Sequence, residues 1–182
     1  MHKASRPTLP AQPETILFVC TANICRSVLA EKILKALLAA AGLAIDVRSA
    51  GIDAAKESKA SPEIVRMLQR EGIDLENHGP QPVTPEKIAG ADIIFVMEYA
   101  HRQRILALAP EASGKIFFLS DFYSGTAKFQ VDRGIPDPAG MSEFFCENVG
   151  EIIRLCCEGV LKELIASFGM DGGTHCKKVA LS

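Results

Sequence analysis

The sequence predicts an α/β fold of one domain, built as a parallel sheet with helices on both faces. Two observations lead to this prediction. Short continuous apolar runs, typical of strands buried on both faces, alternate with longer segments whose apolar residues recur at helical spacing. The length of 182 residues suits one domain, and a hydrophobic content of 48% is enough for a full core.

The first half of the chain shows the alternation most clearly. Residues 16–20 predict a short buried strand, and the leucines and isoleucine of residues 29–38 predict a helix that Gly42 ends. Residues 45–49 predict the next strand. Residues 61–72 predict a helix because Pro62 falls in its first turn, where proline is tolerated. Residues 91–97 predict the second strongly buried strand.

The second half adds a helix over about 100–109, a strand over 115–118, a polar loop over about 120–140 and a long final helix. We expect this final helix to bury one broad face, made of Phe144, Phe145, Val149, Ile152, Ile153, Cys156, Val160, Leu161, Leu164, Ile165 and Phe168. The predicted organisation is a flexible leader over 1–14, a domain over 15–168 and a flexible tail over 169–182. Ligands of parallel sheets bind beyond the carboxyl ends of strands, here the loops after Val19 and Phe118.

Composition and targeting signals exclude several classes of function. The formal net charge of −2 gives no indication of a nucleic-acid or membrane partner. No apolar run reaches the roughly 20 residues that cross a bilayer, and the N-terminus lacks a secretory signal. The six cysteines follow neither a disulfide framework nor paired zinc-ligand spacing. We therefore expect a cytoplasmic protein with mostly free thiols and with no metal or organic cofactor.

The loop after the first strand carries the chemistry, in the run Cys20-Thr21-Ala22-Asn23-Ile24-Cys25-Arg26-Ser27. A tight turn at this place can aim backbone N–H groups at an anion, and the following helix adds its positive end. Arg26 can hold two phosphoryl oxygens, and these charges together favour the thiolate form of Cys20. Residues 21–27 are therefore the predicted phosphate-binding loop. Cys25 is either a plain helix-start residue or a resolving thiol for an oxidised Cys20.

A second candidate group is Asp137, just before the final helix. Departure of an alkoxide or phenolate requires a proton, and hydrolysis of a covalent intermediate requires a base, so one carboxyl group can serve both steps. Pro138 favours an extended backbone at Asp137, which would project the side chain from its loop. From the residues alone, the alternative that this pair only precedes a helix stays open.

These two motifs, in this order, resemble the phosphate loop and the late acid loop of the low-molecular-weight protein tyrosine phosphatases. The likeness extends through residues 49–51, 71–75 with His78, and 91–97, and covers about 15–168. It implies that Cys20 is the nucleophile, Arg26 the phosphate clamp and Asp137 the general acid and then base. It implies further that Ser27 supports the thiolate and that Asn23, Ser49 and His78 hold the loop in shape. His2, His101 and His175 are interpreted as solvated surface residues. The positive side chains Lys87, Arg102 and Arg104 either flank the site or are ordinary solvated charges, and we favour the second interpretation.

The chain departs from the family pattern at several positions. Ala22 stands where the family usually has glycine, which would strain the loop if a positive φ were required there. Val28 stands where the family usually has proline. Neither Ala139-Gly140 nor residues 52–56 supply the usual aromatic walls. We therefore expect an open site with a relaxed substrate range, taking a phosphotyrosine protein or a small phosphomonoester as partner.

There are four alternative functions, of which the first two share this fold. A thiol-dependent arsenate reductase would need two further thiols in the central segment, and residues 58–120 contain no cysteine. A protein-arginine phosphatase tends to have a small polar residue where this chain has Ile24. A non-catalytic phosphate- or phosphopeptide-binding module would have no need of a nucleophile, an arginine and an acid together. A rhodanese-like sulfur carrier would not need Asp137. The sequence leaves the physiological substrate and the oligomeric state open.

Overall fold

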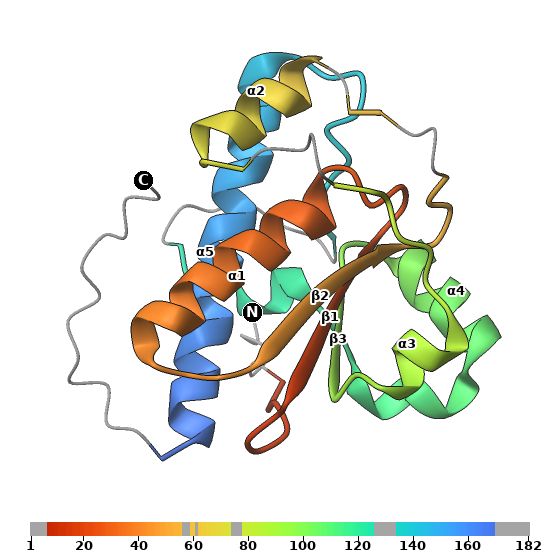
Figure 1. The fold of residues 1–182 in the computed structure, drawn as a ribbon, viewed down its shortest axis with the longest axis vertical. Helices are drawn as coiled ribbons and strands as arrows, with labels where there is room; N and C mark the ends of the chain where they lie inside the picture. Colours follow the sequence, from red (N-terminus) through yellow and green to blue (C-terminus); the bar gives the residue numbers. More distant parts are fainter. Residues whose placement is uncertain (1–6, 56–58, 61, 74–77, 126–133, 170–182) are drawn as a thin grey trace, which may run out of the picture.

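The computed structural model describes residues 7–55, 59–60, 62–73, 78–125 and 134–169 (Figure 1). Strands and helices alternate along this part of the chain. In order they are β1 (Thr15–Cys20), α1 (Arg26–Ala41), β2 (Asp46–Gly51), α2 (Pro62–Arg70), α3 (Pro85–Ala89), β3 (Ile93–Val96), α4 (Tyr99–Leu108), β4 (Ile116–Phe118) and α5 (Glu143–Ser167). Two 3₁₀ helices, η1 (Pro110–Lys115) and η2 (Leu119–Phe122), flank β4.

The sheet has four strands in the order β2-β1-β3-β4, and every neighbouring pair is parallel. This confirms the predicted parallel sheet. In the central pairing Val19 of β1 lies opposite Val96 of β3, so the two strands end side by side. The segments that follow them therefore start at one edge of the sheet, where ligands of parallel sheets bind.

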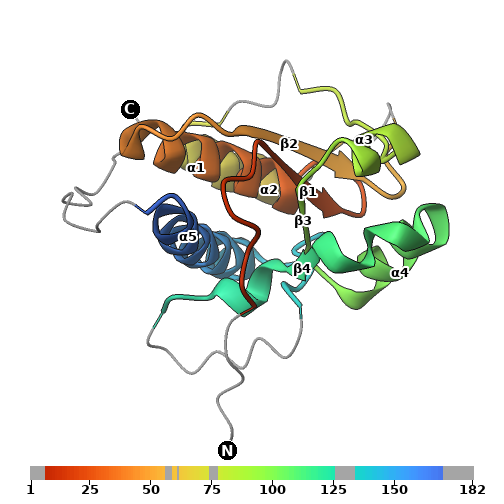
Figure 2. The ribbon, with the colours of Figure 1, turned by 90° about the horizontal axis from the view of Figure 1, so that it is seen from below.

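Helices cover both faces of the sheet (Figures 1 and 2). Along β1, Ile16, Phe18 and Cys20 face the larger core, which α1 and α5 complete. The alternate residues Leu17 and Val19 face a smaller core that α3 and α4 complete. Because successive side chains of a strand point to opposite faces, a strand buried on both sides must be apolar throughout, as residues 16–20 are.

The observed elements differ from the sequence prediction in three places. Helix α3 was not expected; it has only five residues, too few to show periodicity, although Thr84 caps it by accepting a hydrogen bond from the Lys87 N–H. Phe144 was placed on the buried face of the final helix, but it is 74% exposed, because it lies on the side of the helix that also carries the exposed Glu151 two turns later. The predicted loop after β4 begins with η2, in which Phe122 is buried.

The interior also settles the state of most cysteines. Cys146, Cys156 and Cys157 are buried in the larger core, as their apolar spacing predicted. None of the five cysteines of the described segments forms a disulfide, and Cys176 lies outside these segments. Leu9, within the predicted leader, is buried against the same core, and the mobility of residues 1–14 and 169–182 stays a prediction. Among the described helices, none is long and apolar enough to cross a membrane.

Candidate active site

We use the name phosphate loop for residues 21–27, the predicted phosphate-binding segment, which connects Cys20 at the end of β1 with the first turn of α1. The end of β2 lies directly against it, and this contact requires glycine. A Cβ atom on Gly51 would lie 2.5 Å from the backbone oxygen of Thr21 and 2.9 Å from the backbone nitrogen of Asn23. Gly51 therefore lets the neighbouring strand support the loop from one side.

Asn23 is the hub of a buried hydrogen-bond network inside the loop, and its side chain is completely buried. Its amide Nδ2 donates to Ser27 Oγ at 3.0 Å and to Ser49 Oγ at 2.9 Å. Its Oδ1 accepts from the Gln81 backbone N–H at 2.8 Å. The His78 Nε2 donates to the Asn23 carbonyl at 2.7 Å. The network thus joins the loop-supporting residues that the family resemblance implied.

The backbone of the loop places its strain at Asn23 and not at Ala22. Asn23 has φ +56°, in the left-handed region, whereas Ala22 is not among the described residues with positive φ. Asparagine tolerates this region better than most residues. A positive φ is therefore not required at Ala22, because the turn is made one residue later by Asn23, whose side chain is held by hydrogen bonds.

Cys20 ends β1 with its sulfur inside this network. Cys20 Sγ lies 2.9 Å from Ser27 Oγ, and both residues are buried. Because Ser27 Oγ accepts the Asn23 amide N–H, the single Ser27 hydroxyl proton is free to point at the sulfur. A hydrogen bond donated to sulfur favours the thiolate form, which is the nucleophilic form of cysteine.

Arg26 connects the loop with three other segments, and it is only 2% exposed. Its Nη1 donates to a carboxylate oxygen of Glu98 and, at 3.0 Å, to the backbone oxygen of Ile135. Its Nη2 donates to Asp137 Oδ2 at 2.5 Å and lies 3.4 Å from Thr21 Oγ1. One end of the guanidinium is thus held by Glu98, whose side chain is 40% exposed, and by the carbonyl of the buried Ile135, and the other end faces the exposed acid.

Asp137 reaches the site from an exposed segment. Its side chain is 46% exposed, and its Oδ1 accepts from the Ala139 backbone N–H at 3.0 Å. Ile135, two residues earlier, is fully buried, and its N–H donates to the Met97 carbonyl at 2.7 Å. The buried Ile135 therefore fixes the backbone two residues before the exposed Asp137, the predicted acid.

The structure adds Glu98 and Glu31, which the sequence prediction missed. Glu98 pairs with Arg26, and Glu31 of α1 accepts from Ser49 Oγ at 2.5 Å. A signal for Glu98 exists in the sequence: it is the first charged residue after the buried strand β3, at the sheet edge where ligands bind. Glu31 carries no such signal, because a glutamate on a helix is ordinarily solvated.

His101 also belongs to this site, so its interpretation as a solvated surface residue is wrong. It is 1% exposed, and its Nε2 lies 3.1 Å from Thr21 Oγ1. Its Nδ1 accepts the Glu98 backbone N–H at 3.1 Å, which caps the start of α4. Burial and then the charge of Arg26 lower the pKa of His101 to about 4.

Cys25 is in the loop but points into the core, where it is 5% exposed. Burial raises its pKa well above the usual range, so the thiol form dominates. A role for Cys25 as a resolving thiol stays a prediction.

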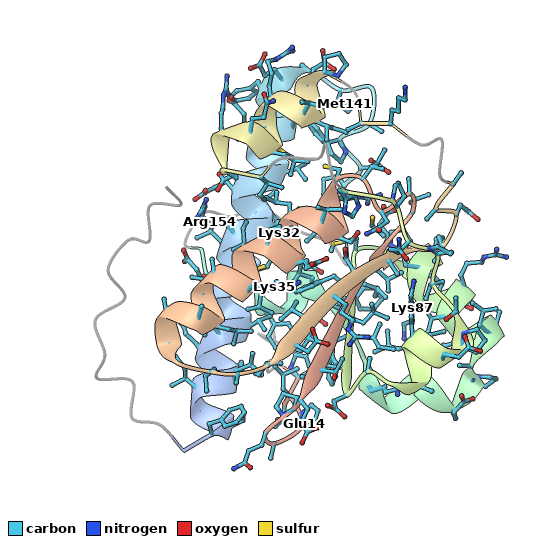
Figure 3. The ribbon with its side chains drawn as sticks, viewed as in Figure 1. Glu14, Lys32, Lys35, Lys87, Met141 and Arg154 are labelled. Atoms are coloured by element: carbon cyan, nitrogen blue, oxygen red, sulfur yellow. The ribbon has the colours of Figure 1, made fainter. Side chains whose placement is uncertain are left out.

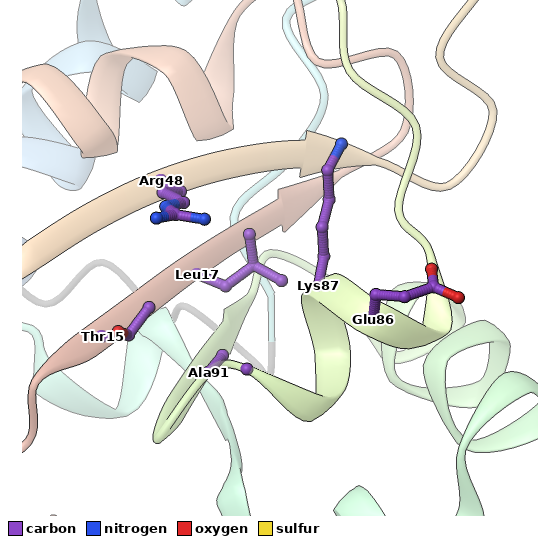
Figure 4. Close-up of a pocket in the computed structure, with 7 residues that line it drawn as sticks. Thr15, Leu17, Arg48, Glu86, Lys87 and Ala91 are labelled. Carbon is purple, nitrogen blue, oxygen red and sulfur yellow. The ribbon is translucent and has the colours of Figure 1, made fainter.

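Other features of the surface lie away from the loop. A small pocket lined by Thr15, Leu17, Arg48, Glu86, Lys87, Gly90 and Ala91 lies toward the amino end of β1, opposite the phosphate loop (Figure 4). Lys87 projects beside α3 and donates to the Pro82 carbonyl (Figure 3). The described residues contain no cluster of three or more His, Cys, Asp or Glu side chains that could hold a metal ion.

Comparisons with known proteins agree with this geometry. The sequence model of the "Low molecular weight phosphotyrosine protein phosphatase" family matches residues 15–168. A protein-arginine-phosphatase of Bacillus subtilis is 38% identical over 111 residues, which cover 61% of this chain and 73% of that protein. The low molecular weight protein-tyrosine-phosphatase Etp of Escherichia coli is 31% identical over 150 residues, covering 82% and 94%. The crystal structure of the tyrosine phosphatase Wzb from Escherichia coli K30 in complex with sulphate superposes with a TM-score of 0.70 at 29% identity, covering 84% of this chain and 99% of that one.

Proposed function

The chain belongs to the low molecular weight phosphotyrosine protein phosphatase family, and from that premise we propose that Cys20, Arg26 and Asp137 hydrolyse phosphate monoesters through a cysteinyl-phosphate intermediate. The observation that carries this assignment is the contact between two separate segments at one guanidinium. Arg26 of the phosphate loop, six residues after Cys20, donates to Asp137 at 2.5 Å. Nucleophile, phosphate clamp and acid are thereby held in one place.

In the first step the Cys20 thiolate attacks phosphorus. A sulfur–phosphorus bond forms as the bond from phosphorus to the ester oxygen breaks, and protonated Asp137 gives its proton to that departing oxygen. The Arg26 guanidinium and the N–H groups of the loop stabilise the charge on the phosphoryl oxygens. The Ser27 hydroxyl, 2.9 Å from the Cys20 sulfur, holds the sulfur in position for attack.

In the second step water attacks the phosphorus of the intermediate. The Asp137 carboxylate, left unprotonated by the first step, accepts a proton from that water, and the sulfur–phosphorus bond breaks. Inorganic phosphate leaves, Cys20 returns as a thiolate and Asp137 is again protonated. No further reactant is required, because the acid of the first step is the base of the second.

Asp137 changes partners during this cycle. In the ligand-free site its carboxylate occupies Nη2 of Arg26, where a phosphoryl oxygen would bind. Substrate therefore displaces the carboxylate from the guanidinium and leaves it beside the ester oxygen. The exposure of Asp137, Ala139 and Gly140 allows this shift without disturbing the core.

The open surroundings of the site favour a broad range of phosphorylated proteins and small phosphomonoesters. Ala139 and Gly140 are exposed and offer no aromatic wall beside Asp137. Ile24 is half-buried in the loop, and its bulk disfavours the guanidinium-linked phosphate of phosphoarginine. We therefore place phosphotyrosine proteins ahead of phosphoarginine proteins as substrates. The buried cysteines of the described residues form no disulfide, which supports a reducing, cytoplasmic location.

The first experiment is hydrolysis of para-nitrophenyl phosphate at mildly acid pH with excess chelator. Wild type should turn over, Cys20→Ser should show no turnover, and Arg26→Ala should be nearly as inactive. Trapping of labelled phosphate on wild type, but not on Cys20→Ser, would identify the intermediate. Turnover by Cys20→Ser equal to wild type would contradict the nucleophile assignment. Competition between a phosphotyrosine peptide and a phosphoarginine peptide then ranks the two substrate classes.

A further inference from the structure

His101 and Thr21 form a pair that the reaction scheme above does not use. The scheme binds phosphate through the loop N–H groups and Arg26 alone. We propose that the Thr21 hydroxyl is an additional phosphate-binding group, and that His101 is the positioning residue that makes this hydroxyl a donor. The proposal rests on the proposed function, since it concerns the same phosphate site.

The tautomer of His101 follows from its two hydrogen bonds. The ring is buried and neutral at physiological pH, so only one of its nitrogens carries a proton. The Glu98 backbone N–H can only donate, so Nδ1, 3.1 Å away, is the unprotonated nitrogen. Nε2 therefore carries the proton and donates it to Thr21 Oγ1 at 3.1 Å. The start of α4 thus fixes the direction of a hydrogen bond inside the phosphate loop.

The remaining capacity of the Thr21 hydroxyl is then limited to donation. Its oxygen accepts from His101 Nε2 and lies 3.4 Å from the Nη2 donor of Arg26. A hydroxyl has two acceptor sites and one proton. With both acceptor sites facing N–H donors, the hydroxyl proton is directed away from them, toward whatever acceptor lies on the third side.

The acceptor expected beside the Thr21 hydroxyl is an anion, because the neighbouring Nη2 of Arg26 already binds one. Nη2 of Arg26 is the nitrogen that now holds the Asp137 carboxylate, whereas Nη1 is taken by Glu98 and Ile135. A phosphoryl oxygen that replaces Asp137 on Nη2 meets the adjacent Thr21 hydroxyl as well. A hydrogen bond to a charged oxygen is among the stronger ones in proteins, so the hydroxyl contributes to phosphate affinity.

His101 also caps α4, and the experiment must separate capping from positioning. Two substitutions divide the functions of the ring. In His101→Asn, the Oδ1 atom replaces Nδ1 as acceptor of the Glu98 N–H, but nothing reaches Thr21. In His101→Gln, the amide Nε2 replaces the ring Nε2 as donor to Thr21, but the cap is lost. Positioning and capping therefore predict opposite orders for the two variants.

The test measures inorganic phosphate binding by calorimetry and kcat/KM for para-nitrophenyl phosphate. Thr21→Val should weaken phosphate binding by about tenfold to a hundredfold, the size expected for a lost hydrogen bond to a charged group. Thr21→Ser should restore most of it. His101→Asn should weaken binding by about three- to tenfold while unfolding in urea at nearly the wild-type midpoint. His101→Gln should bind more tightly than His101→Asn although it is the less stable protein.

A double variant completes the design. In the Thr21→Val background, His101→Asn should cause no further loss of phosphate affinity, because the histidine acts through the hydroxyl. Additive losses, or an affinity order that follows stability, would overturn the proposal. Nitrogen-15 NMR of the histidine ring should show Nε2 protonated and Nδ1 unprotonated; the opposite tautomer would overturn it too. Because phosphate affinity and tautomer need no turnover, these results stand apart from the test of the nucleophile Cys20.

Discussion

The phosphate loop and the segment that carries Asp137 meet at one guanidinium, yet they are held in place very differently. Asn23 is fully buried, and hydrogen bonds join its amide and carbonyl groups to four other residues. Asp137 is 46% exposed and has two polar contacts, one to Arg26 and one to the Ala139 N–H. Many buried hydrogen bonds thus fix the conformation of the loop, whereas the exposed Asp137 carboxylate is free to exchange one hydrogen-bond partner for another.

This difference matches what each region does in the proposed cycle. The loop binds the phosphoryl group in both steps. Movement of the loop would misalign the phosphorus with the attacking and leaving atoms, and phosphoryl transfer depends on that alignment. Asp137 must release Arg26, donate a proton and then accept one, so a rigid burial would prevent its work. Glu98 holds Nη1 of Arg26 throughout, so the guanidinium stays in place while Nη2 exchanges the Asp137 carboxylate for phosphate.

The largest effect that sharpens this comparison is expected for Asp137→Asn. The amide keeps the size of the side chain but cannot give a proton to the leaving oxygen. The loss in kcat should be about 10²–10⁴-fold, larger for an alkyl phosphate than for para-nitrophenyl phosphate, whose leaving group needs less protonation. Steady-state kinetics with the two substrates measure the ratio.

The phosphate affinity of Asp137→Asn serves as its control. Removing the carboxylate that competes for Nη2 should leave phosphate binding equal to wild type or tighter. Wild-type turnover of an alkyl phosphate by Asp137→Asn would show that the acid lies elsewhere.

A smaller loss, uniform across substrates, is expected for Asn23→Ala. The substitution leaves the Gln81 N–H and the hydroxyls of Ser27 and Ser49 without their shared partner in a buried site. We expect about ten- to a hundredfold lower kcat/KM and a loss of about 1–3 kcal/mol in the free energy of unfolding. Kinetics with good and poor leaving groups, together with urea unfolding, check both values.

Ser49→Ala is the matched control for that variant, because it removes only the outer member of the network. It should cost less of both activity and stability than Asn23→Ala. A loss for Asn23→Ala that depended on the leaving group, as for Asp137→Asn, would break the distinction between a fixed loop and an acid that changes partners.

Much of the fold was predictable because it depends on local patterns. The continuous apolar run of residues 16–20 reflects a strand buried on both faces, and the helical spacing of residues 29–38 reflects a helix buried on one side. These two local patterns predicted β1 and α1. Helix α3 was not predicted, because a helix of five residues has no repeating apolar face; its Thr84 cap and its first-turn proline define it instead. Phe144 was misplaced because the predicted face was too broad: its spacing puts it with the exposed Glu151 and not with the buried Val149.

The residues of the candidate site also fall into two groups, those that local sequence patterns predicted and those that only the fold brings to the loop. Cys20 and Arg26 lie close together in the sequence, so their spacing predicted one loop, and the family resemblance added Asp137. Glu98 and His101 approach the loop from another strand–helix connection, more than seventy residues away. No local pattern distinguishes a histidine that caps a helix beneath a phosphate loop from one that points to solvent. Only the parallel pairing of β1 with β3 brings the two connections together.

The last prediction tests that correction, and it concerns stability as a function of pH. Burial and Arg26 lower the pKa of folded His101 to about 4, while Glu98, Asp137 and Asp53 oppose the shift, and Arg104 lies 3.8 Å from Asp53. In the unfolded chain the ring has an ordinary pKa of about 6.5. Between these two values the unfolded state binds the proton and the folded state does not, so stability falls as the pH falls from about 6.5 to about 4.

His101→Asn removes this contribution and leaves the other titrating groups in place. The stability difference between wild type and His101→Asn should therefore shift against wild type by about 2 kcal/mol between pH 7 and pH 4.5. Urea unfolding of both proteins at the two pH values measures the shift, and taking the difference cancels the carboxylates that both proteins share. A difference that does not change with pH would mean that the ring titrates normally. His101 would then be solvated as its sequence context suggested, and α4 would be uncoupled from the phosphate loop.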